Sequence, residues 1–318
     1  MRVTGRNPAG PLDASSPGAG VHEPGDRQPD GLSFGAMSLV LLLCFIWGGN
    51  FIAIMISNRG FEPILAASIR SATAAVLLLV WGLLIRHDLR VRGRALLHCF
   101  IVSLFFAGEF LFVYWGTKYT LASRATVLLY TSPFWVTLGA HFLLGERLTA
   151  PRITGLSLAF AGVVAVFGAG FATPGGSLLG DFMELLGAVF WAGNTLYGKR
   201  TLGRYRVSPT QLLFYQVLFS APFLFAGSLI VEGAPVVDVR TDAVLALLHQ
   251  TVVVVTITYL AWFWLLRTYK AGNLAAFTFI TPLFGVLMGG IVLGEPLPWL
   301  LWVGAVLVAV GIYLVNRR

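Results

Sequence analysis

Charged residues are scarce in this sequence. Only 11% of its 318 residues are Asp, Glu, Lys or Arg, whereas 57% are hydrophobic. A soluble globular domain has about 25% charged residues, so this chain has too little polar surface to face water on all sides. The shortage excludes an ordinary soluble protein and predicts an integral membrane protein, in which most side chains face lipid or other helices.

Motifs for catalysis and cross-linking are also missing. The two cysteines, Cys44 and Cys99, lie in apolar segments, so we interpret them as core residues and expect no disulfide and no metal site. There is no HExxH sequence and no GxxxxGK[ST] loop. We therefore expect no enzyme, no cofactor and no ATP-driven pump. The net charge of +8 lies in short connections, which membrane topology explains better than a nucleic-acid partner does.

The first 35 residues differ from the rest of the chain. They are rich in Pro, Gly, Asp and Arg, a composition that buries too little apolar surface to offset the cost of ordering. They lack the short apolar core and cleavage site of a signal peptide. We expect residues 1–35 to form a disordered cytoplasmic tail.

Ten apolar runs follow this tail. Each is close to the ~20 residues that span a bilayer as a helix. Their approximate limits are 36–57, 63–86, 95–117, 124–144, 152–170, 180–199, 209–231, 243–267, 273–293 and 297–316. The sequence therefore predicts an all-α membrane protein of ten transmembrane helices with little room for extramembrane domains.

The Lys and Arg residues predict the orientation. If both termini are cytoplasmic, 17 of the 22 Lys and Arg residues fall in the tail, the inner connections and the C-terminus, four fall outside, and Arg70 lies within a helix. Because cytoplasmic connections carry the excess of Lys and Arg, we expect a multi-pass protein of the cytoplasmic membrane with both ends inside.

The chain contains an internal repeat. Five landmarks of the first half recur in order in the second half, at offsets of 144 to 149 residues: Trp47 and Trp191, Pro63 and Pro209, Trp115 and Trp264, Pro133 and Pro282, and Glu146 and Glu295. Each unit has five helices, and an odd number makes the second copy enter the membrane from the other side. Inverted repeats are the architecture of many secondary transporters.

These residues resemble the EamA repeat of the drug/metabolite transporter superfamily. The resemblance rests on Trp47-Gly48-x-Asn50, on Arg70 in the second helix and on Pro133 followed by a terminal Leu-Gly-Glu. It covers residues 36–316, with one repeat over 36–170 and the other over 177–316. It implies proton-coupled or facilitative export of amino acids or other small metabolites, along a pathway lined by helices one, three, four, six, eight and nine. The second copy departs from the pattern, because Gln216 stands where the first has Arg70.

The paired prolines are the strongest pointer to a binding site. Each removes a backbone donor near the middle of a helix, and we expect a kink there. A single proline is tolerated in a membrane helix, but interruptions at corresponding positions of two repeats favour a site at the midplane. Neighbouring polar residues would line the opening: Tyr130, Ser132, Thr278 and Thr281.

Glu109 is an acid near the centre of the third predicted helix, where a charge costs about 2.5–3.5 kcal/mol. It could carry a proton, bind a substrate amine, or be neutralised by Arg70 as a structural pair. Arg70 in turn could bind a substrate carboxylate or extend its charged end toward the interface. The sequence leaves these alternatives open.

Other side chains could line the pathway or pack beside it. Asn50 and Asn194 could hold helices together or bind polar substrate groups. Aromatic walls would come from Trp47, Trp191, Tyr114, Trp115, Tyr259, Phe263 and Trp264. Glu146 and Glu295 lie at helix ends, and we interpret both as structural, with Glu146 and Arg147 as a solvated pair. We assign no ligand role to His98, His141 or His249.

These features predict a secondary transporter that exports amino acids or similar metabolites by alternating access. The alternatives are a carrier of nucleobases, vitamins, drugs or sugar derivatives, and a membrane-embedded enzyme or scaffold. The expected partners are a small-molecule substrate and the bilayer, with protons left open and nucleic acid excluded, in a monomer or a homodimer. The candidate pathway comprises Trp47, Asn50, Arg70, Glu109, Tyr130, Ser132, Pro133, Trp191, Asn194, Tyr259, Phe263, Thr278, Thr281 and Pro282, with Glu109 as the candidate for proton coupling.

Overall fold

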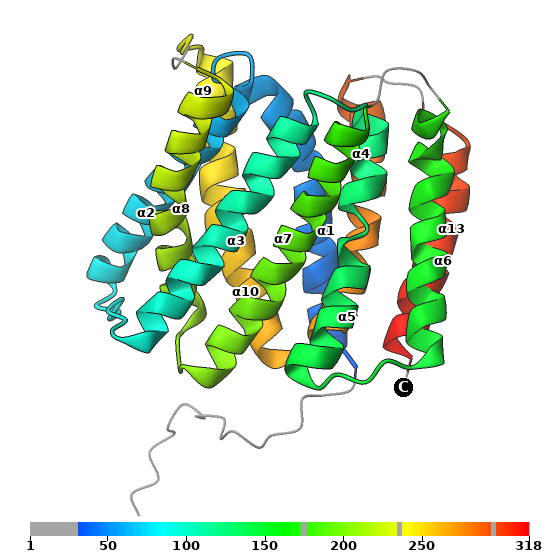
Figure 1. The fold of residues 1–318 in the computed structure, drawn as a ribbon, viewed down its shortest axis with the longest axis horizontal. Coiled ribbons are helices and arrows are strands. Elements are labelled where there is room, and N and C mark those ends of the chain that lie inside the picture. Colours follow the sequence, from blue (N-terminus) through cyan, green and yellow to red (C-terminus); the bar gives the residue numbers. More distant parts are fainter. Residues whose placement is uncertain (1–30, 173–176, 234–236, 294–296, 318) are drawn as a thin grey trace, which may run out of the picture.

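The structure is a computed structural model that describes residues 31–172, 177–233, 237–293 and 297–317. The regular elements of the described chain are helices joined by short connections, apart from one isolated bridge between Phe61 and Val237 (Figure 1). The helices of the first half are α1 (Phe34–Ser57), α2 (Pro63–Leu84), α3 (Arg94–Gly116), α4 (Ala122–Leu129), α5 (Ser132–Leu144), α6 (Ala150–Phe167) and η1 (Gly168–Phe171). Those of the second half are α7 (Leu178–Arg204), α8 (Pro209–Val231), α9 (Thr241–His249), η2 (Gln250–Thr258), α10 (Tyr259–Thr268), α11 (Ala271–Phe277), η3 (Thr278–Ile280), α12 (Thr281–Met288), η4 (Gly289–Leu293) and α13 (Leu300–Asn316).

The predicted all-α membrane fold is confirmed. Eight helical spans of the described chain are long and apolar enough to cross a membrane, and α13 is a shorter apolar helix. The ten predicted runs correspond to α1, α2, α3, α4 with α5, α6, α7, α8, α9 to α10, α11 to η4, and α13. The predicted disordered tail lies outside the described residues up to residue 30, and its last two residues already belong to α1, which begins at Phe34.

Corresponding helices of the two repeats begin in the same way. The hydroxyl of Ser33 accepts a hydrogen bond from the backbone N–H of Ala36, and the hydroxyl of Ser177 accepts one from Gly180, each at 3.2 Å. These side chains satisfy N–H groups that have no partner inside the helix. Pro63 and Pro209 occupy the first positions of α2 and α8, where proline fits the helix. The repeat is therefore visible in the start signals of its helices.

The packing of the helices is also related by the repeat. Helix α2 packs against its counterpart α8, and α6 packs against its counterpart α13. The pair formed by α1 and α12 corresponds to the pair formed by α7 and α5. Gly48 permits the first of these contacts, because a Cβ there would lie only 2.7 Å from the Thr281 carbonyl oxygen. The two repeats therefore contact each other through pairs of corresponding helices.

The two proline-containing spans are interrupted. In the first repeat α4 ends at Leu129, and Pro133 is the second residue of α5. In the second repeat α11 ends at Phe277, a short 3-10 turn follows, and Pro282 is the second residue of α12. Each proline-containing span is therefore interrupted near its middle, as expected from the paired prolines, and each proline lies at the start of the following helix, a position at which its missing N–H costs nothing.

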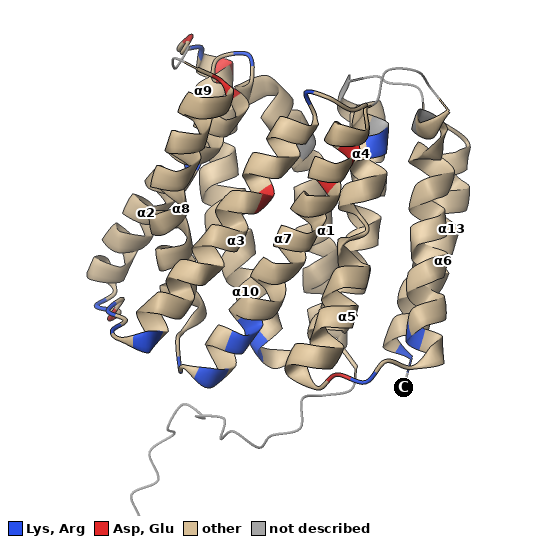
Figure 2. Cartoon of the chain, viewed as in Figure 1, with Lys and Arg blue, Asp and Glu red and all other residues tan. Residues whose placement is uncertain are grey.

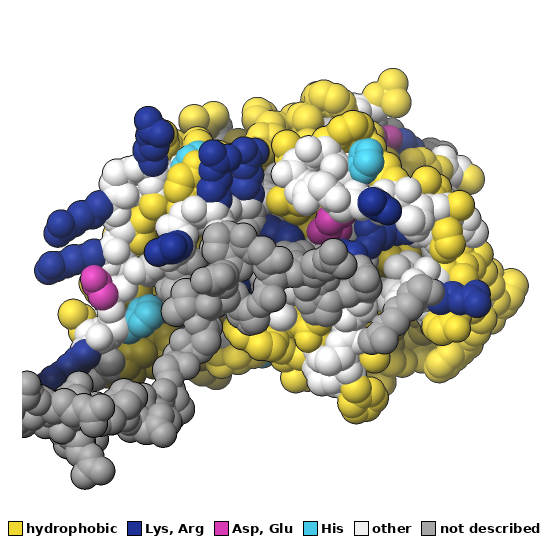
Figure 3. Space-filling view, turned by 90° about the horizontal axis from the view of Figure 1, so that it is seen from below, with side chains coloured by type: hydrophobic (Ala, Val, Ile, Leu, Met, Phe, Trp, Pro, Cys, Tyr) yellow, Lys and Arg dark blue, Asp and Glu magenta, His cyan; other side chains and the backbone are white. Residues whose placement is uncertain are grey.

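The charged residues divide the molecule into two ends. Lys and Arg gather where α7 ends and α3 and α6 begin (Figure 2). We name this the basic end. Figure 3 looks onto it and shows Lys and Arg side chains spread between hydrophobic flanks. We name the other end, where α4 and α7 begin, the opposite end. Helix α1 runs from the basic end and α7 runs toward it, so the two repeats are inverted (Figure 1).

Candidate functional site

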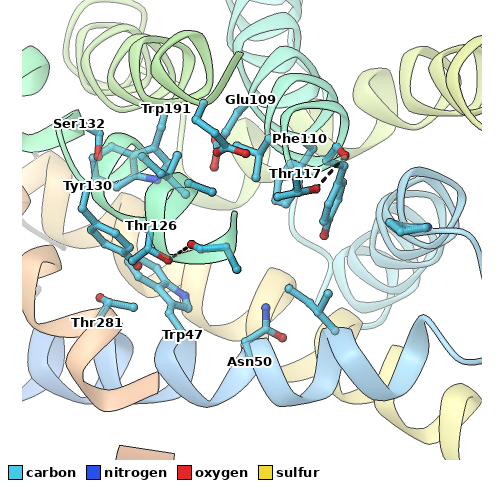
Figure 4. Close-up of a pocket in the computed structure, with 18 of the residues that line it drawn as sticks. Trp47, Asn50, Glu109, Phe110, Thr117, Thr126, Tyr130, Ser132, Trp191 and Thr281 are labelled. Atoms are coloured by element: carbon cyan, nitrogen blue, oxygen red, sulfur yellow. Dashed lines mark hydrogen bonds between the residues drawn. The ribbon is translucent and has the colours of Figure 1, made fainter. Parts of the chain in front are cut away.

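A cavity of about 410 Å³ lies between the two repeats (Figure 4). Its lining reaches Asn58, Thr117 and Ala122, which are exposed at the opposite end. In the other direction it ends at Trp47 and Trp191, inside the molecule. The cavity is therefore accessible from the opposite end and closed toward the basic end. Its size suits a small organic ligand.

The structure places most of the candidate pathway residues around this cavity. The residues that line it are Trp47, Asn50, Arg70, Glu109, Tyr130, Ser132, Trp191, Tyr259, Thr278 and Thr281. Four other candidates lie elsewhere. Pro133 and Pro282 are buried at the starts of α5 and α12, Phe263 packs against Gly198, and Asn194 is buried in α7 outside the lining.

The floor of the cavity is aromatic. The rings of Trp47 and Trp191 both pack against Trp262, at centroid distances of 5.4 and 5.9 Å. The indole N–H of Trp47 donates a hydrogen bond of 2.7 Å to the hydroxyl of Thr258. Tyr259 adds a further ring, 5.9 Å from Trp47. This layer gives a substrate a large apolar surface at the depth of the helix interruptions.

Arg70 and Glu109 bring opposite charges to the cavity. Arg70 is 2% exposed and its guanidinium carbon lies 4.4 Å from the centroid of the Phe110 ring. Its Nε and Nη2 atoms, like Oε2 of Glu109, are buried without a hydrogen-bond partner in the described structure. No ion pair joins the two side chains among those that the structure describes. The structure thus shows no direct Arg70–Glu109 ion pair among the described residues, and Arg70 is buried beside the cavity instead of extending to the surface.

The two paired asparagines lie in different surroundings. Asn50 lines the cavity, across from Glu109 and Trp191 (Figure 4). Asn194 is buried, and its amide oxygen has no hydrogen-bond partner in the described structure. Only the asparagine of the first repeat can touch a ligand in this conformation.

Sequence reasoning missed Glu184, a second acid in the cavity wall. It is fully buried in α7, and neither of its carboxylate oxygens has a hydrogen-bond partner in the described structure. Its position three residues after Asp181, close to the start of a helix, is typical of an acid near the membrane surface. The contact with α3 that buries it could not be found from local sequence.

Three of the seven predicted aromatic wall residues lie outside the cavity lining: Trp115, Phe263 and Trp264. Trp264 is 49% exposed on the outer surface of α10 and lies outside the cavity lining. Its neighbour Phe263 points inward, because adjacent residues of a helix face different sides. The prediction that Trp264 lines the pathway is therefore wrong for this conformation.

Glu146 helps to close the basic end. Its carboxylate accepts hydrogen bonds from the backbone N–H groups of Ala271 at 2.7 Å and Gly272 at 3.2 Å. It also lies 3.7 Å from the cationic nitrogens of Arg152 and Lys199. The predicted solvated pair with Arg147 is wrong: Glu146 is buried and joins α5 to the start of α11, at which a negative charge is favoured. Its counterpart Glu295 lies outside the described residues.

The histidines His141 and His98 both lie near this same end of the molecule. His141 forms a hydrogen bond of 2.9 Å with the carbonyl oxygen of Glu146. His98 contacts the hydroxyl of Tyr197 and stacks on Tyr205 at a centroid distance of 4.1 Å. Both histidines take part in packing, and the described residues hold no group of His, Cys, Asp and Glu that could bind a metal ion.

Comparison with known proteins gives consistent matches over nearly the whole chain. The sequence pattern of the EamA-like transporter family matches residues 34–168 and 178–317. The uncharacterized transporter YvbV of Bacillus subtilis (strain 168) is 28% identical over 289 residues, covering 88% of this chain and 91% of that protein. A probable amino-acid metabolite efflux pump of Salmonella typhimurium is 26% identical over 287 residues, covering 87% and 93%. The corresponding Escherichia coli protein is 25% identical over 283 residues, also covering 87% and 93%.

A solved crystal structure shares the fold. It superposes with a TM-score of 0.76 at 20% sequence identity, and the match covers 88% of this chain and 96% of the other.

Proposed function

This chain belongs to the EamA-like transporter family and is a multi-pass membrane transporter, and we propose that it exports amino acids or related zwitterionic metabolites by alternating access. The observation that carries the proposal is the pair of unpaired charges, Arg70 and Glu109, in one cavity between the repeats. Two relatives at 25–26% identity are described as probable amino-acid metabolite efflux pumps.

The charges of the cavity suit the two ends of an amino acid. A guanidinium group binds a carboxylate through parallel N–H donors, and Arg70 has donors without a partner. The carboxylate of Glu109 can bind an α-ammonium group. Because an unpaired charge inside a membrane protein is costly, binding a zwitterion satisfies both groups at once. The aromatic floor formed by Trp47 and Trp191 would hold the side chain of the substrate.

The proposed orientation places the basic end in the cytoplasm. The Lys and Arg residues at that end favour it, and both termini would then be cytoplasmic. The cavity in Figure 4 would face outward. Glu146 and its partners would close the cytoplasmic side in this conformation.

The test is substrate exchange in liposomes that contain the purified protein. Labelled amino acids should exchange into vesicles preloaded with the same compound, and analogues that lack the carboxylate or the ammonium group should compete at least about tenfold less well, as expected for a lost charged contact. Arg70→Gln should abolish the exchange. Arg59→Gln is the matched control, because Arg59 is exposed and lies 3.6 Å from Asp242, outside the cavity.

Other outcomes separate the alternatives. Exchange of nucleobases, vitamins, drugs or sugar derivatives without any exchange of amino acids would overturn the proposed substrate and leave the transporter assignment intact. Equal competition by analogues without either charged group would show that Arg70 and Glu109 do not bind the two ends of the substrate.

A further inference from the structure

The cavity wall formed by α3 and α7 contains two acids, Glu109 and Glu184, whereas binding the single ammonium group of a zwitterion requires only one. The two helices run antiparallel and in close contact, so that Gly116 faces Met183 and Glu184, and Gly187 faces Val113. A Cβ at Gly187 would lie 3.7 Å from the carbonyl oxygen of Glu109. Because Glu184 precedes Gly187 by three residues, it lies about one helical turn, roughly 5 Å, beyond Glu109 toward the opposite end.

Glu184 has no counter-charge of its own. A Cβ at Gly116 would lie 2.9 Å from its Oε1 atom, so the side chain fills a space that only glycine leaves open. Both oxygens are buried and unpartnered in the described structure. Arg124 of α4, which also packs against α7, is paired with Asp181, to which it donates from Nε at 3.1 Å. Thr120 donates to the same carboxylate at 2.6 Å.

The other titratable and charged groups near this wall do not supply a counter-charge for Glu184. Helix α3 presents Glu109 and the phenol of Tyr114 to the cavity, and α2 presents Arg70. Helix α10 presents the phenol of Tyr259. Lys118, in the connection after α3, is exposed and donates to the carbonyl oxygen of Val231. The cavity thus holds two acids, Glu109 and Glu184, and one base, Arg70.

We propose that Glu184 is the proton-binding site that couples transport to the pH gradient, while Glu109 and Arg70 hold the substrate. This inference rests on the proposed function. A buried carboxylate without a counter-charge or a hydrogen-bond partner is unfavourable, and a proton is the one cation that needs neither extra ligands nor extra space. Protonation transfers H⁺ from a hydronium ion of the external solution, which reaches the open cavity, to a carboxylate oxygen of Glu184 and leaves a water molecule. No described hydrogen bond or ion pair has to break.

The spacing of the two acids explains how a proton and a substrate would exchange. An ammonium group held by Glu109 lies about one helical turn from Glu184, and its positive charge stabilises the ionised carboxylate of Glu184 over the neutral, protonated form. Substrate binding therefore favours release of the proton, and loss of the substrate favours its uptake. One proton would move inward for each amino acid that moves outward.

The test separates proton coupling from substrate binding. In proteoliposomes, Glu184→Gln should keep substrate exchange without a pH gradient within about twofold of the wild type, and should lower transport driven by a pH gradient at least about tenfold, within the range usual for coupled sites. A pH-sensitive dye inside the vesicles should no longer report proton movement when substrate is added. Glu184→Asp should restore part of both signals.

Asp242→Asn is the matched control, since Asp242 is a partly exposed acid at the same end that lies outside the cavity lining, and both assays should stay unchanged. A second measurement needs no variant. Dicyclohexylcarbodiimide, which reacts with protonated carboxyl groups in apolar surroundings, should label Glu184 in the wild type, and substrate should lower the labelling several-fold.

Three results would overturn the proposal. The first is a Glu184→Gln variant with intact pH-driven transport, and the second is loss of exchange and of pH-driven transport to the same degree. The third is a sodium gradient that replaces the pH gradient in the wild type. If the wild type exchanges no amino acid at all, the proposed substrate fails, and the dye and labelling measurements with whichever solute is exchanged still decide the role of Glu184.

Discussion

In the first repeat, Arg70 and Glu109 face the cavity, whereas the corresponding residues of the second repeat are Gln216 and Thr258. Both of these are fully buried outside the cavity lining. The serines that begin α1 and α7 and the prolines that begin α5 and α12 are, by contrast, the same in both repeats. The residues that begin the helices are thus the same in both repeats, whereas the charged residues of the cavity occur in only one of them. Substitutions that make the two repeats more alike can therefore show which residues are needed for folding and which for substrate exchange.

Exchanging the residues at positions 70 and 216 should have the largest effect. Gln216→Arg places a guanidinium at a fully buried position, where neither polar atom of the glutamine side chain has a hydrogen-bond partner in the described structure. An uncompensated buried charge destabilises a protein by roughly 3–5 kcal/mol. We expect little folded protein, measured as the monodisperse fraction after detergent extraction. Arg70→Gln, the reverse change, should fold normally and lose substrate exchange. Normal folding of Gln216→Arg would show that the second repeat tolerates the charge and that the asymmetry is not structural.

Gly48→Ala should have the next largest effect. The added Cβ would lie 2.7 Å from both the Cβ of Phe284 and the carbonyl oxygen of Thr281, so α1 and α12 must move apart. Overpacking of this kind costs about 1–3 kcal/mol and should lower the midpoint of thermal unfolding in detergent. The second repeat already has alanine at this position, and Ala192→Gly should cost at most about 1 kcal/mol. Equal losses for the two variants would contradict the close contact at Gly48.

Much of the scaffold could be predicted from the sequence because the same apolar runs and prolines occur at corresponding positions in both halves of the chain. The ten apolar runs gave the helical spans, and the paired prolines marked the interruptions that border the cavity. Arg70, Glu109 and Tyr130 could be chosen because polar groups in the middle of apolar runs are expensive and need a reason to be there.

The residues that were missed depend on contacts between distant segments. Glu184 lies close to the start of its helix, and only the packing of α3 across Gly116 buries it. Glu146 is followed directly by Arg147, which suggested a local pair. Gly145, with a φ of 70°, instead turns the chain so that Glu146 reaches the start of α11. Neither arrangement leaves a pattern in the local sequence.

Glu146→Gln should loosen the basic end by a smaller amount. The amide can still accept hydrogen bonds from Ala271 and Gly272, but the attraction to Arg152 and Lys199 is lost, a change of about 1–2 kcal/mol for hydrogen-bonded charged groups. Movement of α11 would uncover Cys44, which is fully buried with its sulfur 3.5 Å from the carbonyl oxygen of Phe277.

Alkylation of Cys44 by N-ethylmaleimide, in a Cys99→Ala background, should therefore become several-fold faster in Glu146→Gln. Arg147→Gln is the matched control, because the side chain of Arg147 is exposed and outside this network. Equal alkylation rates in both variants would show that Glu146 does not hold the basic end closed.

Substitution of the paired asparagines, Asn50 and Asn194, should have the smallest effect. Only the substitution in the first repeat should change the KM for substrate exchange. Asn50→Ala removes a polar side chain that lines the cavity, so we expect KM for exchange to rise a few-fold, as is typical of a neutral hydrogen bond worth about 1 kcal/mol, with kcat and thermal stability nearly unchanged. Asn194→Ala removes a buried amide whose oxygen has no partner in the described structure, so it should leave KM unchanged. Kinetic and thermal measurements on both variants would sharpen the comparison. A rise in KM for Asn194→Ala alone would mean that the second repeat contributes its asparagine to the substrate in the other conformation of the transport cycle.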